Sequence, residues 1–168
     1  MGILLKNEDL TSPALERLGQ FVRQQRQQGT SQANVAKFEV FEGELHEHMM
    51  ALERELIAAE LARYDVEAET VEVEGTVYRY TLTSSETYLS AAGPVTVARH
   101  LYRPAGRSSK SICPLELRAG IVGGLFTPRA ARQGAFGVAH LTPREAAALF
   151  GEMGGMTARE IDEVRLPD

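Results

Sequence analysis

The order of apolar and polar positions predicts a helical start, a β-rich middle and a helical end. A first helix is predicted between Ser12-Pro13 and Gly29, because serine is a favoured N-cap and proline suits the first helical position. Its apolar face comprises Leu15, Leu18, Phe21 and Val22. This helix is short, and its polar end around residues 24–28 indicates a solvated surface.

A longer helix is predicted over residues 34–64, where apolar residues recur every three or four positions. This seam comprises Phe38, Phe41, Leu45, Met49, Leu52, Leu56 and Ala59. Its mean step of about 3.5 residues is the period of a coiled coil, and such a helix extends for about 45 Å. Either a second copy pairs with the seam, or the first helix folds back on it. Because the first helix is only half as long, the seam favours dimerisation.

The apolar period changes to two in the middle of the chain. Val71 and Val73 alternate with glutamates, Gly75 supplies a turn, and residues 76–82 are rich in β-branched and aromatic side chains, which predicts a hairpin. A second hairpin is predicted from residues 88–89, the Gly93-Pro94 break and residues 95–102. The result would be a small antiparallel sheet of about four strands.

Helical signals return in the last forty or so residues. Thr127-Pro128 and Thr142-Pro143 each combine an N-cap with a first-turn proline, and Glu145 completes a capping box. A further capping box, Thr157 with Glu160, predicts a third helix over residues 158–164. The predicted fold is therefore α+β: a helical region (1–66), a β region (67–126) and helix-turn-helix-like helices (127–168).

The net charge of −5 conceals a basic middle. Residues 76–140 carry 8 basic and 2 acidic groups, whereas the helix before them is acidic from Glu39 to Glu60. The basic block could bind a polyanion, or the acidic helix could neutralise it; both alternatives stay open. Acidic residues in the predicted third helix argue against its reading DNA. The candidate DNA contacts are Arg99, Arg103, Arg107, Lys110, Arg118, Arg129, Arg132, Arg144 and Arg159.

Other chemistry finds little support in the sequence. Cys113 is the single cysteine, so neither a disulfide nor a cysteine metal cluster is expected. His46 and His48 lie two residues apart, whereas the helical zinc motif places its histidines four apart. No uncharged run approaches the roughly 18 residues of a membrane span. We therefore expect no metal, no cofactor, no membrane and a cytoplasmic location.

Several segments together resemble the N-terminal region of bacterial insertion-sequence transposases of the ISKra type. They are residues 93–99, 101–103, 113–120, 125–131, 141–147 and 154–157. The resemblance covers roughly residues 70–157, and it rests on the order of the segments more than on any single one. It implies a β region, a Pro-Leu-acidic segment and a helix-turn-helix, followed in that family by a catalytic RNase H-type domain.

The 168 residues leave no length for that catalytic domain. The resemblance therefore implies a truncated, non-catalytic fragment for DNA binding and dimerisation in DNA transposition, and not an enzyme. Its partners would be DNA at the element ends and a second copy or an intact transposase, with nucleoid association when DNA is bound. The alternative is a protein-interaction module that binds a partner helix through the acidic seam and contacts no DNA.

Overall fold

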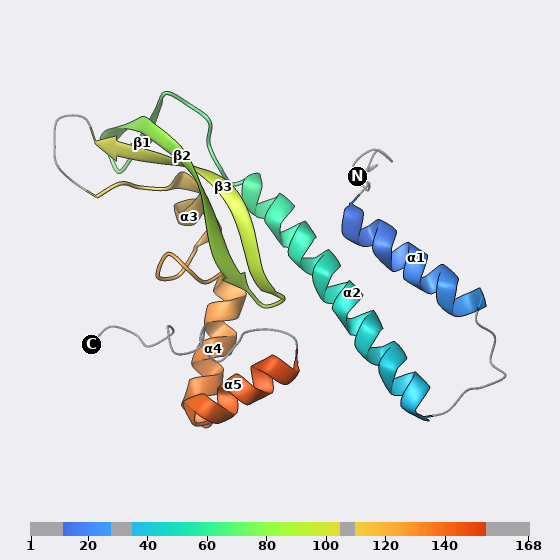
Figure 1. Cartoon of the computed structure of the whole chain (residues 1–168). Helices are drawn as coiled ribbons and strands as arrows, with labels where there is room; N and C mark the ends of the chain where they lie inside the picture. Colours follow the sequence, from blue (N-terminus) through green and yellow to red (C-terminus); the bar gives the residue numbers. More distant parts are fainter. Residues whose placement is uncertain (1–11, 28–34, 105–109, 154–168) are drawn as a thin grey trace, which may run out of the picture. The chain divides into compact units, whose positions relative to one another are not determined.

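The computed structural model describes residues 12–27, 35–104 and 110–153. These residues form five helices and a three-stranded antiparallel sheet of order β1-β2-β3, which confirms the α+β class (Figure 1). The elements are α1 (Pro13–Gln27), α2 (Val35–Ala62), β1 (Thr70–Val73), β2 (Thr76–Ser90), β3 (Gly93–Pro104), α3 (Pro114–Ala119), α4 (Pro128–His140) and α5 (Pro143–Glu152). The chain divides into two compact units, Met1–Glu55 and Leu56–Asp168.

In the first unit, α1 packs antiparallel against α2. The predicted N-cap is confirmed, since the Leu15 amide donates to Ser12 Oγ at 3.1 Å. The Ala14 amide donates to Glu55 Oε2 at 2.8 Å, and the Phe21 ring centroid lies 5.6 Å from that of Phe41. The hairpin alternative for the two helices is therefore present in the structure.

This hairpin covers only one edge of the apolar seam on α2. Phe41 contacts α1 through the stacked Phe21 ring. In contrast, Phe38, Met49 and Leu56 remain 60%, 48% and 54% exposed. Leu45 and Leu52 are half-buried and Ala59 is exposed. The seam therefore retains an apolar edge that α1 does not occupy.

The sheet has three strands in the described part of the chain, where about four were predicted. The predicted strands at residues 76–82 and 88–89 belong to one strand, β2, which pairs with β1 at its start and with β3 from Tyr78 to Ser90. A register shift between Tyr80 and Leu82 accommodates one extra residue, so β2 continues through its polar middle. The predicted turn at Gly75 is confirmed: Glu74 and Gly75 both have positive φ, 50° and 74°.

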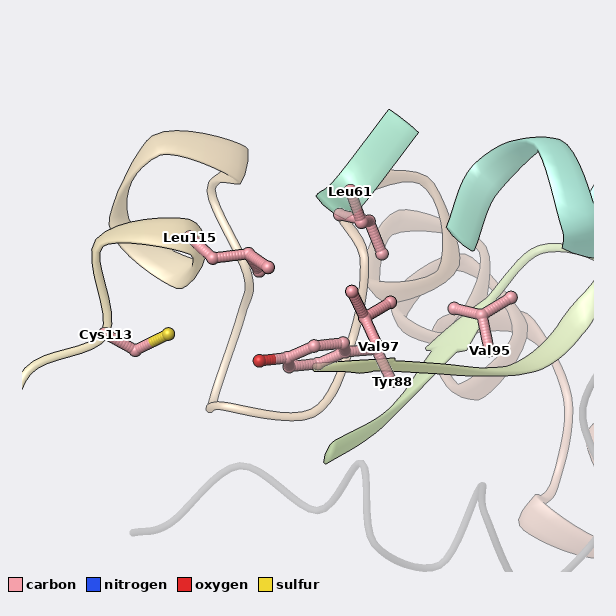
Figure 2. Close-up of a cluster of buried hydrophobic side chains, with 6 residues drawn as sticks. All are labelled: Leu61, Tyr88, Val95, Val97, Cys113 and Leu115. Atoms are coloured by element: carbon pink, nitrogen blue, oxygen red, sulfur yellow. The ribbon is translucent and has the colours of Figure 1, made fainter. Parts of the chain in front are cut away.

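One face of the sheet carries the first hydrophobic cluster of the second unit. Figure 2 shows Leu61 from the end of α2 and Leu115 from α3 approaching the side chains of the hairpin. The cluster comprises Leu61, Tyr88, Val95, Val97, Cys113 and Leu115. Burial raises the pKa of the Cys113 thiol, so the thiolate is disfavoured and the single cysteine serves the core. The end of α2 therefore belongs with the sheet.

A second cluster joins the sheet to the C-terminal helices, and it consists of Leu89, Phe126 and Ala130. The Thr127 amide donates to the Leu89 carbonyl at 2.9 Å, which fixes the start of α4 on β2. The predicted β and C-terminal regions therefore lie in one compact unit.

The helices α4 and α5 begin where their threonine-proline signals predict. The capping box of Thr142 and Glu145 is confirmed, whereas Thr127 makes no side-chain cap hydrogen bond. The predicted third helix at residues 158–164 lies outside the described residues, so the helix-turn-helix stays a prediction. None of the described helices is long and apolar enough to cross a membrane.

Candidate nucleic-acid interface

Arg99 lies in an ion-pair cluster between β2, β3 and α3. Its Nη2 binds Glu86 Oε2 at 2.5 Å, its Nη1 binds Glu116 Oε1, and Nη1 also donates to the Tyr88 hydroxyl at 3.0 Å. The Arg99 side chain is only 14% exposed. Because Arg99 is buried and already binds two carboxylates, it is unsuited to contact a DNA phosphate. We therefore leave it out of the proposed interface. Its partners are not the predicted glutamates of the acidic helix.

The cluster around Arg99 changes the charge balance of the basic block. Glu86 and Glu116 are the only acidic residues between positions 76 and 140, and both bind Arg99. The remaining basic residues of the block thus have no acidic partner within it. The described ones are Arg79, Arg103, Lys110, Arg118, Arg129 and Arg132. All six are exposed, and none forms an ion pair within residues 12–27, 35–104 and 110–153. Within residues 76–140, exposed basic side chains that lack an ion pair therefore remain.

The first two turns of α4 carry two of these cations. Arg129 and Arg132 lie three residues apart and share one helical face. The helix has no acidic residue in its first turn and no side-chain cap, and a helix N-terminus carries partial positive charge. An anion is favoured at such a place both by the arginines and by the backbone N–H groups.

The other predicted contacts lie on separate elements. Arg103 on β3 donates from Nε to Ser111 Oγ at 3.0 Å. Lys110 immediately precedes Ser111 in the chain. Arg118 on α3 donates to the Tyr64 carbonyl at 3.1 Å. Arg144 is exposed in the first turn of α5, beside the capping residue Glu145. Arg107 and Arg159 lie outside the described residues.

The sequence did not single out Arg79, because its significance depends on the register of the strands. Residues Arg79 and Arg103 are directly opposite each other on β2 and β3. The two predicted hairpins did not pair these segments, because they placed residues 76–82 opposite 71–73 and residues 95–102 opposite 88–89. We therefore add Arg79 to the candidate interface because the strand register places it beside Arg103.

The sequence analysis also did not identify a histidine site, which lies on the face of the sheet opposite Arg79 and Arg103. His100 Nδ1 lies 2.6 Å from Asp65 Oδ2, and the His100 amide donates to Asp65 Oδ1 at 3.2 Å. Beside the imidazole is a cavity of about 440 Å³ lined by Glu67, Ala68, Glu69, Tyr80, Thr83 and His100. Its two glutamates disfavour a phosphate, so this site is not part of the candidate interface. The Asp65 contact ties the segment after α2 to β3.

Within the part of the chain that the structure describes, no group of three or more His, Cys, Asp or Glu side chains could hold a metal ion. No protein-family model, curated protein or solved structure matches the chain.

Proposed function

We propose that the chain is a non-catalytic DNA-binding and dimerisation segment of an insertion-sequence transposase of the type it resembles. The observation that supports DNA binding is the surplus of cations within residues 76–140: the two acidic residues of this block bind Arg99, and six exposed basic side chains remain. Phosphate contacts of this kind bind DNA with little sequence preference and position it.

The salt dependence of duplex DNA binding tests this function. We expect the full chain to bind duplex DNA with an affinity that falls steeply as salt rises, because each neutralised phosphate releases a counterion. The double variant Arg129→Gln/Arg132→Gln should lower the slope of log K against log salt by about 2, at roughly 0.9 for each phosphate contact. Fluorescence anisotropy with labelled duplex measures both quantities.

Arg63→Gln is the matched control, since Arg63 is exposed but already pairs with Glu60 at 2.8 Å. Its slope should equal that of the unaltered chain. Circular dichroism spectra of all variants should coincide, as the three arginines are exposed. A chain that fails to bind duplex at low salt, or whose binding ignores salt, would contradict the DNA-binding function.

The dimerisation part rests on the exposed edge of the seam, Phe38, Met49 and Leu56. Its occupant in this proposal is the same hairpin of a second copy. Charge supports this choice: exposed glutamates at 39, 42 and 53 flank the seam, whereas α1 exposes Arg17, Arg23 and Arg26. Two hairpins packed through their seams can set the basic α1 of one copy against the acidic flank of the other.

A further inference from the structure

The register of the sheet places two arginines side by side. Arg79 on β2 and Arg103 on β3 are direct partners in the antiparallel ladder, so their side chains lie on the same face. Like charges at directly opposite positions destabilise a sheet. Neither arginine has an ion pair in the described parts of the chain. Within the described residues, this end of the sheet therefore holds two neighbouring positive charges without an ion-pair partner.

Hydroxyl groups flank the arginine pair on both sides. Thr70 on β1 is the ladder partner of Arg79, and Ser111 accepts a hydrogen bond from Arg103 Nε at 3.0 Å. Ser111 is held there because its neighbour Ile112 exchanges two backbone hydrogen bonds with Tyr102, at 2.8 and 2.9 Å. Four neighbouring segments thus present a row of threonine, arginine, arginine and serine.

All four side chains can donate hydrogen bonds, and a tetrahedral oxyanion can accept several at once. Arginine is suited to phosphate because its planar fork makes two parallel hydrogen bonds to one group. The Nε bond to Ser111 restricts the Arg103 side chain while its two Nη groups remain for a ligand. An anion between the two guanidinium groups would also remove their repulsion.

We propose that Arg79 and Arg103, flanked by Thr70 and Ser111, form a binding site for one phosphate group, and that this group belongs to the backbone of bound DNA. The second part rests on the proposed function, whereas the site itself does not. Arg103 was already predicted as a DNA contact. The site adds Arg79 and the two hydroxyl residues and gives the contacts a defined ligand.

The variants Arg79→Gln, Arg103→Gln and the double variant test the site without DNA. In low-salt buffer, removing either charge relieves the repulsion, so the thermal unfolding midpoint should be equal to or higher than that of the unaltered chain. Inorganic phosphate should raise the midpoint of the unaltered chain and have less effect on each variant. Arg63→Gln, which removes a paired charge, is the control and should retain the full phosphate response.

Duplex DNA provides the second arm. Each single variant should weaken duplex binding about tenfold, the effect of losing one charge-assisted contact. The double variant should lose less than the product of the single effects, because both arginines bind the same group.

The outcomes separate the site from the function. A phosphate response that survives in the double variant, or midpoints that fall in all three variants without ligand, would overturn the site. A lost phosphate response with unchanged duplex affinity would overturn the DNA assignment of the site. If the unaltered chain binds no duplex yet its phosphate response depends on both arginines, the proposed function fails and the phosphate site stands.

Discussion

Tyr88 joins two charged side chains inside the second unit. Its hydroxyl donates to Glu116 Oε1 at 3.0 Å and accepts from Arg99 Nη1 at 3.0 Å. Burial is the main cause that raises the pKa of Tyr88 above its ordinary value. Ionisation would place a second negative charge beside Glu116, so the neutral phenol is the form that the folded chain accommodates.

This arrangement predicts alkaline sensitivity that depends on Tyr88. Because folding raises the pKa of Tyr88, its contribution to stability is complete below about pH 10, the ordinary tyrosine pKa. This contribution is lost as the pH rises further. Tyr88→Phe should lower the free energy of unfolding at neutral pH by about 1–3 kcal/mol, since hydrogen bonds to charged partners are lost. Its stability should then fall less steeply above pH 10.

Urea unfolding at several pH values measures the stability change, and tyrosinate absorbance gives an independent signal. Tyrosinate that appears only on unfolding should decrease in Tyr88→Phe. Tyr78→Phe is the comparison, since Tyr78 forms no such cluster with the residues that the structure describes and is only half-buried. Identical alkaline profiles for the unaltered chain and Tyr88→Phe would show that Tyr88 does not control this transition.

At the scale of helices and strands, local sequence signals predicted where helices begin. They did not predict which residues distant in sequence would pair. Ser12-Pro13 and the Thr142-Glu145 box act within one turn of helix, so the sequence alone located both starts. Arg99 instead binds glutamates 13 and 17 residues away, and its charge suggested an open surface. The polar residues near Ser84 have no sequence pattern that predicts a strand. They belong to β2 because they pair with β3.

The packing of α4 on α5 predicts opposite effects for two glycine substitutions. A Cβ added at Gly137 would lie 2.8 Å from Phe150 Cε2, whereas one added at Gly151 would meet nothing within 4 Å. Gly137→Ala should therefore destabilise the chain by about 1 kcal/mol through overpacking. Gly151→Ala should stabilise it by about 0.5 kcal/mol, because alanine has the higher helix propensity.

Urea unfolding of the two glycine variants measures this difference directly, and an unchanged m-value would show that the unfolded state is the same. Gly151→Ala serves as the control for the helix propensity of alanine within the same helix pair. Equal stability changes for both variants would mean that α4 and α5 do not pack closely at Gly137.

At the scale of the whole molecule, the proposed dimer depends on the seam of α2. Substituting Met49 by lysine puts a charge in the centre of the apolar edge, so Met49→Lys should convert a dimer into a monomer. The matched control is Val40→Lys on the same helix. Val40 is 60% exposed, but it follows Phe38 by two residues and therefore faces away from the seam.

Sedimentation equilibrium of the full chain distinguishes these outcomes. We expect the unaltered chain and Val40→Lys to be dimers at micromolar concentrations, and Met49→Lys to be a monomer with unchanged helical content. Weak salt dependence of the dimer would support an apolar seam, whereas strong dependence would assign the contact chiefly to the α1 arginines and the α2 glutamates. Dissociation by both lysine variants, or a monomeric unaltered chain, would exclude this seam as the interface. Because the proposed DNA contacts lie on the second unit, Met49→Lys should keep the salt slope of DNA binding for each copy while losing the avidity that two linked copies provide.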